Sequence, residues 1–193
     1  MSQVKVKRRI PSPKDLAQLL RFRKVILSPR KRRLTRALTI YDLRDIAKRR
    51  TPQAPFDYTD GGADTETSLT RARAAYEKLE FQPKILLNVK DVDLSVQMLG
   101  KKMSMPLGIA PTGFTRMMQT EGEYAGACAA ADAGIPFTLS TMGTRSIEDV
   151  AKAAPTGRNW FQLYMWKDRD RSMVLVDRAK TAGFDTLVLT VDV

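Results

Sequence analysis

Histidine is absent from the 193 residues of this chain, and cysteine occurs once, at Cys128. Without histidine, these residues cannot form a Ser–His–Asp triad, a histidine general base or a histidine metal site. A single cysteine excludes an internal disulfide framework and is typical of a reducing compartment. No apolar run approaches the roughly 18 residues that cross a membrane. We therefore expect a cytoplasmic protein whose chemistry would depend on a carboxylate, a tyrosine or a bound cofactor.

Positive charge is in excess at one end only. The net charge is +12, and residues 1–36, with thirteen lysines and arginines and one acid, account for all of it. One interpretation is an arm that keeps the protein in solution. The other is peripheral contact with an anionic membrane or with a partner subunit, because leucines lie among the basic residues. Nothing in this arm, residues 1–38, has the interleaved aromatics of base stacking, so no nucleic acid is expected.

Two helices and a hairpin are predicted for residues 39–105. Thr39 and Asp42 form a capping-box pattern before "IYDLRDIAKRR", and this helix should stop before Pro52. A second helix is predicted over roughly 66–78, after a break at Gly61-Gly62. The stretch "PKILLNVKDVDLSVQMLGKKMSM" predicts a hairpin-like strand pair with its turn at Gly100-Lys101.

A regular alternation of strands and helices begins after Met105. Strands are predicted at "PLGIAPTG", "PFTLSTM", "NWFQLYM" and "DTLVLTVDV", with a helix between each pair. Consecutive strand–helix units form a parallel sheet, and a closed barrel of this kind needs eight strands and about 250 residues. Residues 106–193 therefore predict an α/β fold, strands one to four of a TIM (β/α)8 barrel. Four more units would be expected after Val193.

Polar side chains gather at the carboxyl ends of these strands, where such barrels place their active sites. Strand one ends in Pro111-Thr112-Gly113, and the polar residues of the next three strands are Ser140-Thr141, Gln162 and Tyr164, and Thr190 and Asp192. Residues two apart in a strand face the same side, so both members of each of the last two pairs should point into the barrel mouth. A hydroxyl there is more often structural, whereas a buried amide or carboxylate needs partners. The pattern predicts a cofactor or substrate pocket and leaves the ligand open.

Several stretches closely resemble the FMN-dependent α-hydroxy-acid dehydrogenases and oxidases. They are "MPLGIAPTGF", "EGEYAGACAAADAGIPFTLSTM", "SIEDVAKAAP", "WFQLYMWKDRDR", "AGFDTLVLTVDV" and the upstream "FDYTDGGADTETSLTRARAAYEKLEFQPKIL". Within this family the chain is most similar to the N-terminal part of quinone-linked L-lactate dehydrogenases. The resemblance implies FMN as cofactor, oxidation of a 2-hydroxy acid such as lactate to pyruvate, a quinone acceptor and a homo-oligomer at full length.

The resemblance also implies a role for each matching residue. The backbone of Pro111, Thr112 and Gly113 would lie against the flavin ring, and Ser140, Gln162 and Thr190 would hydrogen-bond to it. Tyr164 would contact the substrate and stabilise the charge that develops on it. Asp192 would orient a catalytic histidine that lies beyond the chain end, as a carboxylate can hold an imidazole in one tautomer.

The chain departs from the family pattern at three points. The tyrosine that binds the substrate carboxylate aligns, without gaps, with Leu43, and Tyr41 two residues away lies on another helix face. Met142 replaces the tryptophan of glycolate oxidases, which favours a dehydrogenase-like pocket. The lysine, histidine, arginines and phosphate loops of the family would follow Val193. We therefore expect the 193 residues alone to be inactive and to hold FMN poorly.

Other interpretations remain open at this point. The chain could be a non-catalytic half-barrel that self-associates through the exposed edges of strands one and four. It could instead belong to another FMN-dependent 2-hydroxy-acid oxidase, or to a type 2 isopentenyl-diphosphate isomerase, although "FQLY" and "LTVDV" argue against the latter. In a further interpretation the basic tail, as an anchor to an anionic membrane, is the functional part.

Overall fold

The computed structural model describes residues 25–191 and divides the chain into two compact units, one ending at Arg50 and one beginning at Thr51. The domain boundaries predicted after residues 38 and 105 stay predictions. No helix within the described residues is both long enough and apolar enough to span a bilayer.

The first unit contains two short capped helices, α2 (Pro29–Arg36) and α3 (Ile40–Lys48). The predicted capping box of α3 is confirmed: the Thr39 hydroxyl accepts the backbone N–H of Asp42, and the Asp42 carboxylate accepts that of Thr39 at 2.9 Å. The backbone N–H groups of Leu38 and Thr39 hold the pKa of the Asp42 carboxyl below its ordinary value. Helix α2 was not predicted from the sequence.

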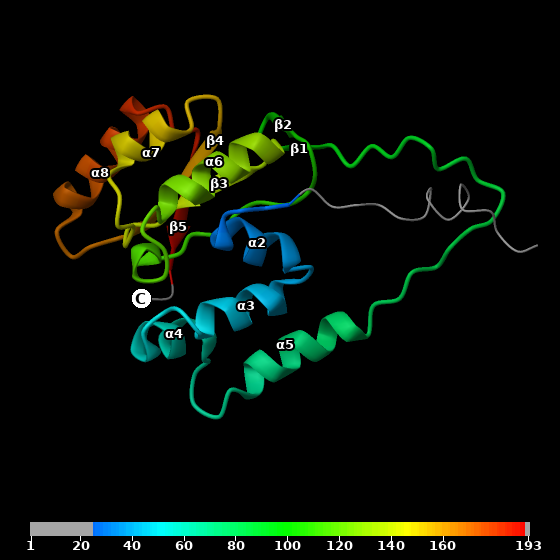
Figure 1. The fold of residues 1–193 in the computed structure, drawn as a ribbon. Helices are drawn as coiled ribbons and strands as arrows, with labels where there is room; N and C mark the ends of the chain where they lie inside the picture. Colours follow the sequence, from blue (N-terminus) through cyan, green and yellow to red (C-terminus); the bar gives the residue numbers. More distant parts are fainter. Residues whose placement is uncertain (1–24, 192–193) are drawn as a thin grey trace, which may run out of the picture. The chain divides into compact units, whose positions relative to one another are not determined.

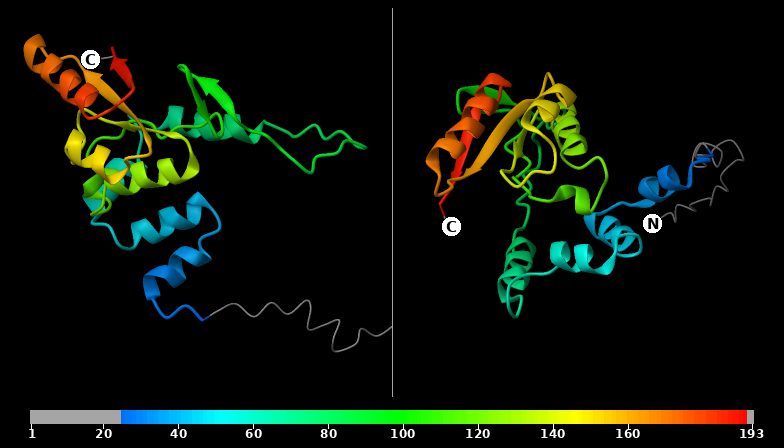
Figure 2. Two further views of the ribbon diagram at one scale, coloured as in Figure 1. Left: turned by 90° about the horizontal axis from the view of Figure 1, so that it is seen from above. Right: turned by 90° about the vertical axis from the view of Figure 1, so that its left-hand side faces the viewer.

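The second unit opens with α4 (Gln53–Asp60) and α5 (Thr67–Glu77), followed by a hairpin of β1 (Val96–Met98) and β2 (Lys101–Met103). Helix α5 and the hairpin are as predicted, and α4 is an addition. The hairpin turn lies at Leu99-Gly100, one residue earlier than predicted; both residues have positive φ (49° and 76°), as a two-residue type I′ turn requires. Between α5 and β1 the chain runs as a long loop (Figures 1 and 2).

Strands and helices then alternate as expected (Figure 1). The elements are α6 (Glu123–Ala133), β3 (Pro136–Leu139), α7 (Ile147–Ala153), β4 (Arg158–Tyr164), α8 (Arg169–Thr181) and β5 (Thr186–Thr190). The strands pair in parallel in the order β3-β4-β5. Two predicted helix ends are confirmed: Ser146 caps α7 by accepting the Asp149 N–H at 3.1 Å, and Gly134 ends α6 with a left-handed backbone.

The first of the four predicted barrel strands is reduced to a single bridge. Ile109 pairs in parallel with Phe137, through hydrogen bonds of 2.9 Å to the Pro136 carbonyl and 3.0 Å from the Thr138 N–H. The next donors along this ladder would be the backbone N–H groups of residues 111 and 136, and both residues are prolines, so the pairing stays short. The short 3₁₀ helix η1 (Thr115–Met117) follows.

The two faces of the sheet carry different residues. Phe137, Leu139, Phe161 and Leu163 pack with α6, α7 and α8 in one apolar core. The alternate positions, such as Gln162, therefore point to the opposite face. The register pairs Gln162 with Val188 and Tyr164 with Thr190, so polar strand ends meet on that face.

Candidate functional site

A cavity of about 940 Å³ lies at the carboxyl ends of the strands, on the face opposite the three helices. A volume of this size accommodates a small molecule or a cofactor. Its lining comes from three parts of the second unit: the residues that end β3, β4 and β5, the loop of residues 111–118, and α4 with the turn that follows it.

The cavity brings together every predicted site residue that the structure describes. They are Pro111, Thr112, Gly113, Ser140, Gln162, Tyr164 and Thr190. The remaining one, Asp192, lies outside the described residues. The placement agrees with the strand-end argument, and the individual roles stay predictions.

Gln162 is the centre of a hydrogen-bond network at the strand ends. Its side chain is 1% exposed; Oε1 accepts the Thr141 backbone N–H at 3.0 Å and the Ser140 hydroxyl at 3.2 Å, and Nε2 donates to Thr190 Oγ1 at 2.7 Å. Because a backbone N–H can only donate, the amide oxygen must face Thr141 and the amide nitrogen must face Thr190.

Thr141 ties the backbone of β4 to the end of β3. The ladder between these strands stops at Leu139 and Phe161. Beyond it, Thr141 Oγ1 donates to the Gln162 carbonyl at 2.6 Å and accepts the Tyr164 N–H at 3.0 Å. One hydroxyl thus replaces two ladder hydrogen bonds and fixes the backbone that carries Gln162 and Tyr164. Sequence reasoning located Thr141 at the strand end but assigned it no role.

The loop of residues 111–118 packs closely on the segment after β3. The Phe114 N–H donates to the Met142 carbonyl at 3.1 Å. A Cβ on Gly113 would lie 2.9 Å from Met142 Cβ, which is too close for two carbon atoms, so only glycine fits at this position. Met142, which stands where glycolate oxidases have a tryptophan, lines the cavity, and so does Phe114.

Sequence reasoning missed the contribution of α4. Tyr58, its neighbours Asp57 and Thr59, and residues 61–63 after the helix all line the cavity. The lining therefore holds a tyrosine besides Tyr164, whereas the sequence alignment looked for one at Leu43, in the first unit. The signal that could have found it is "FDYTDGG", a tyrosine one turn before a Gly-Gly break.

The described lining fits the ring of a flavin, but it does not fit the phosphate. Neutral donors and acceptors of Ser140, Gln162 and Thr190 suit the polar edge of the ring, and the backbone of residues 111–113 borders the same space. Asp57 is the one charged side chain among the described lining residues, and it repels a phosphate. A phosphate needs cationic side chains or a helix N-terminus, so its anchor is not in this lining. The described residues also hold no cluster of three or more metal-ligating side chains.

Comparisons with known proteins agree with this geometry. The model of the FMN-dependent dehydrogenase family matches residues 47–193. A Mycobacterium tuberculosis (strain ATCC 25618 / H37Rv) protein, provisionally named an L-lactate dehydrogenase, is 60% identical over 188 residues, which are 97% of this chain and 45% of that protein. An L-lactate dehydrogenase of Ectopseudomonas mendocina (strain ymp) is 47% identical over 151 residues, 78% of this chain and 40% of that enzyme.

Solved structures give the same picture. A chimera of (S)-mandelate dehydrogenase superimposes with a TM-score of 0.75 at 41% identity, covering 80% of this chain and 43% of the other. A mandelate oxidase gives 0.75 at 39% identity, covering 81% and 47%. The predicted barrel-type α/β fold is confirmed by these likenesses. The chain spans less than half the length of the relatives it matches.

Proposed function

Because the chain belongs to the FMN-dependent dehydrogenase family, we propose that its second unit forms one wall of the flavin and substrate site of an L-lactate dehydrogenase. The observation that supports this most is the convergence of Gln162, Thr190, Ser140 and Tyr164 with residues 111–113 on one cavity. Since the chain spans less than half of its relatives' lengths, the activity is proposed for a site that it supplies only in part.

Oxidation of lactate to pyruvate removes two electrons and two protons from the C2–H and O–H groups of the substrate. FMN, when bound, supplies the two-electron acceptor. The Gln162 amide N–H and the Thr190 hydroxyl would donate to the polar edge of the ring, and the Ser140 hydroxyl, which donates to Gln162 Oε1, fixes the amide in that orientation. Donors fixed there also stabilise the negative charge that arrives with the electrons.

Two tyrosines of the cavity are assigned to the substrate. Tyr58 on α4 binds the carboxylate, in place of the tyrosine that was sought at Leu43, and Tyr164 at the end of β4 donates to the oxygen on C2. Proton removal requires a base, and these residues contain no histidine. Asp192 is assigned to orient an imidazole from outside them, so the 193 residues alone are expected to be inactive.

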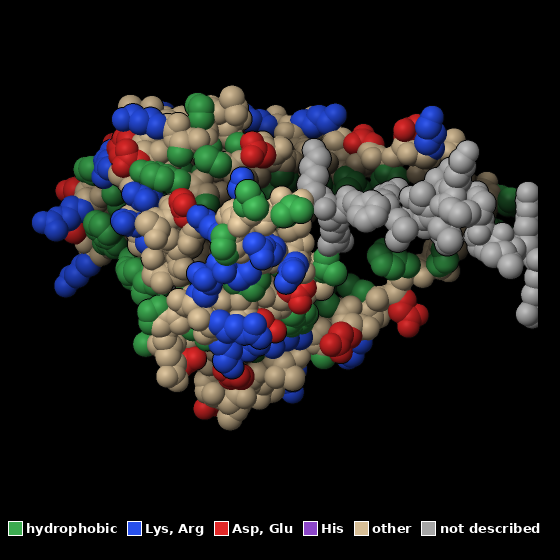
Figure 3. Space-filling view, in the orientation of Figure 1, with side chains coloured by type: hydrophobic (Ala, Val, Ile, Leu, Met, Phe, Trp, Pro, Cys, Tyr) green, Lys and Arg blue, Asp and Glu red, His purple; other side chains and the backbone are tan. Residues whose placement is uncertain are grey.

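A quinone acceptor and a place on the cytoplasmic face of a membrane complete the proposal. Helix α2 carries Arg30, Lys31, Arg32, Arg33 and Arg36 and no acid. Figure 3 shows lysine and arginine side chains gathered over α2 and α3. An anionic lipid surface attracts such residues by about 1 kcal/mol each. Binding to vesicles that contain phosphatidylglycerol, lost at high salt and absent with phosphatidylcholine alone, would support this contact; equal binding to both would contradict it.

Self-association is the second candidate. Strand β5 pairs with β4 alone in the described structure, and its Leu187 and Leu189 are 48% and 50% exposed. An open strand edge with apolar side chains can pair with another copy. Sedimentation equilibrium of the chain with and without FMN separates the candidates: a dimer that binds no flavin favours self-association as the function.

The flavin site is tested by comparing FMN with riboflavin, which has the same ring and no phosphate. Because the described lining fits the ring alone, the chain should bind both weakly and with dissociation constants within about threefold of each other. Quenching of flavin fluorescence on titration measures both. Binding of FMN alone would place the phosphate anchor within this chain, and binding of neither would contradict the proposed function.

A further inference from the structure

Glu123 is a buried carboxylate next to the cavity loops, and the proposed function does not use it. It lies in the first turn of α6 and is 2% exposed. Burial raises the pKa of Glu123, but hydrogen bonds, the Thr144 backbone N–H foremost, outweigh burial and place the pKa below its ordinary value. The carboxylate is therefore ionised at neutral pH, and a buried charge requires strong partners.

Those partners belong to a loop that lines the cavity. The Thr144 backbone N–H donates to Glu123 Oε1 at 2.7 Å, and the Thr144 hydroxyl lies 2.8 Å from Oε2 and 3.0 Å from Oε1. Hydrogen bonds to an ionised group are about twice as strong as neutral ones. Thr144 is in the segment 140–146 between β3 and α7, which contributes Ser140 and Met142 to the cavity.

Segment 140–146 in turn fixes the loop 111–118. The Met142 carbonyl accepts the Phe114 N–H, and Gly113 packs against Met142 too closely for any side chain. Between Met142 and Thr144, a Cβ on Gly143 would lie 2.8 Å from Leu139 Cδ1, so this turn has little room to shift. A displacement of Thr144 would therefore also shift the backbone of Met142 and Gly113, which borders the cavity.

Arg145 adds further contacts between the segment 140–146 and residues 120–124. Its Nη2 donates to the Thr120 carbonyl at 3.1 Å, and its guanidinium lies 4.1 Å from the centre of the Tyr124 ring. Residues 120–124 thus hold residues 144–145 by a carboxylate, a carbonyl and an aromatic face. Of these three contacts, Glu123 alone is buried and charged on the α6 side.

We propose that Glu123 is a positioning residue that fixes the two cavity loops, residues 111–118 and 140–146, without touching the cofactor or the substrate. The inference rests on the proposed function for its consequence, because fixed loops hold the flavin ring against Ser140 and the backbone of residues 111–113. Its structural part is independent of that function and stands on the contacts of Thr144 with Glu123 and of Met142 with Phe114 and Gly113.

Hydrogen exchange on the 193-residue chain tests the structural part. In Glu123→Ala, the amides of residues 111–118 and 140–146 should exchange at least about tenfold faster, while those of β4 exchange as in the wild type. Thr144→Val, which keeps the backbone bond and loses the hydroxyl, should give a smaller change in the same two segments. Thr144→Ser, which keeps the hydroxyl, should exchange as the wild type does. Glu148→Gln is the matched control, since Glu148 also lies in the first turn of a helix but its side chain is 42% exposed.

Flavin titration of the same variants tests the functional part. The FMN dissociation constant should rise about tenfold in Glu123→Ala and stay within twofold of the wild type in Thr144→Ser and Glu148→Gln. Unchanged exchange in both segments would overturn the proposal, and so would equally faster exchange in β4, which would make Glu123 a residue of general stability. If the wild-type chain binds no flavin, the proposed function fails while the exchange pattern still decides the positioning role. Thr144→Val supplies that pattern if Glu123→Ala does not fold.

Discussion

At the carboxyl ends of β4 and β5, Gln162 and Thr190 are joined by a neutral amide–hydroxyl bond, whereas at the amino ends Arg158 and Asp185 are joined by an ion pair of 2.9 Å. The first pair lines a cavity. The second pair contacts the β1–β2 hairpin instead, through Lys101 and the Leu99 carbonyl. We call the carboxyl ends of the two strands, with Gln162 and Thr190, the binding edge, and their amino ends, with Arg158 and Asp185, the anchoring edge.

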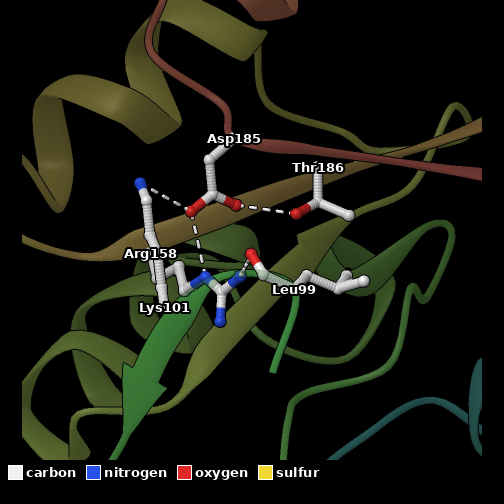
Figure 4. Close-up of polar contacts among 5 residues, drawn as sticks. All are labelled: Leu99, Lys101, Arg158, Asp185 and Thr186. Atoms are coloured by element: carbon white, nitrogen blue, oxygen red, sulfur yellow. Dashed lines mark hydrogen bonds and ion pairs between the residues drawn. The ribbon is translucent and has the colours of Figure 1, made fainter. Parts of the chain in front are cut away.

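The anchoring edge is drawn in Figure 4. Asp185 Oδ2 accepts from Arg158 Nε and Lys101 Nζ, both at 2.9 Å, and Arg158 Nη2 donates to the Leu99 carbonyl at 3.3 Å. Lys101 and Leu99 belong to the hairpin, so one carboxylate and one guanidinium clamp it to the sheet. In barrels of this type, residues at the bottom face serve stability and residues at the top face serve function. Substitutions at the two edges should therefore separate ligand binding from stability.

The largest effect is expected for Gln162→Leu. The substitution removes the donor to Thr190 and to the flavin and leaves the Thr141 N–H without its buried acceptor. We expect flavin affinity to fall about 100-fold, because the ligand loses a hydrogen bond and its own polar edge is left unpaired in the complex, at a cost of about 1–3 kcal/mol. Fluorescence titration with riboflavin measures the loss. Thr186→Val, at the other end of β5, is the control and should bind as the wild type does.

Asp185→Asn should produce the reverse pattern. The Arg158 and Asp185 side chains are only 11% and 14% exposed, so removal of the carboxylate leaves a guanidinium charge nearly buried. We expect the free energy of unfolding to fall by about 2 kcal/mol, a partial version of the loss at fully buried pairs. Urea unfolding followed by circular dichroism measures it. A parallel loss of flavin affinity would contradict the separation of the two edges.

The same edge should respond to acid. Burial raises the pKa of Asp185, but Lys101, Thr186 and Arg158 lower it more, so the folded-state pKa lies below the ordinary 3.8. A lowered carboxyl pKa adds stability that is complete above 3.8 and disappears as the pH falls through the folded value. Arg158 lies 5.1 Å from the centre of the Trp160 ring, so Trp160 emission in a Trp166→Phe background reports on the clamp. The acid-induced emission change of the Trp166→Phe protein should be absent when Asp185→Asn is added to it.

A smaller effect is expected for Thr141→Val at the binding edge. The variant keeps the shape of the side chain but leaves the Gln162 carbonyl and the Tyr164 N–H without their partner. We expect a loss of about 1 kcal/mol in the free energy of unfolding and faster exchange of the Tyr164 amide. Thr138→Val on β3 is the control. If both variants behave alike, the Thr141 hydroxyl does not fix the strand end.

Local signals let the sequence predict much of the framework and most of the cavity. The caps of α3 and α7 each depend on residues three apart, and the strand-end residues follow from an alternation of two. Helix α4 was missed because Pro52 and Pro55 suggest a break, although proline is tolerated in the first turn of a helix. Because Tyr58 lies on this helix, its place in the cavity lining was missed as well.

Contacts between distant parts of the chain could not be predicted in the same way. The clamp joins Lys101, Arg158 and Asp185, and the carboxylate of Glu123 meets Thr144 21 residues later. No spacing rule connects such residues before the hairpin, the strands and α6 are placed in space. The reduction of the first strand to one bridge at Ile109 also depends on tertiary pairing, although the flanking prolines were visible.

The smallest effect is expected for Glu148→Gln, the exposed counterpart of the anchoring edge. Glu148 on α7 accepts two 2.8 Å hydrogen bonds from Arg178 on α8, which lower the pKa of Glu148 to about 2. The side chains are 42% and 44% exposed, so water screens the pair and most of this shift does not become stability.

We expect Glu148→Gln to lower the free energy of unfolding by no more than about 0.5 kcal/mol at neutral pH. What the pair contributes should be complete above the ordinary pKa of 4.5 and should disappear as the pH falls toward 2. Urea unfolding at pH 7 and pH 3, beside Asp185→Asn, measures both. A loss as large as that of Asp185→Asn would mean that burial is not what makes the Arg158–Asp185 clamp strong, since both pairs join an arginine to a carboxylate at nearly the same distance.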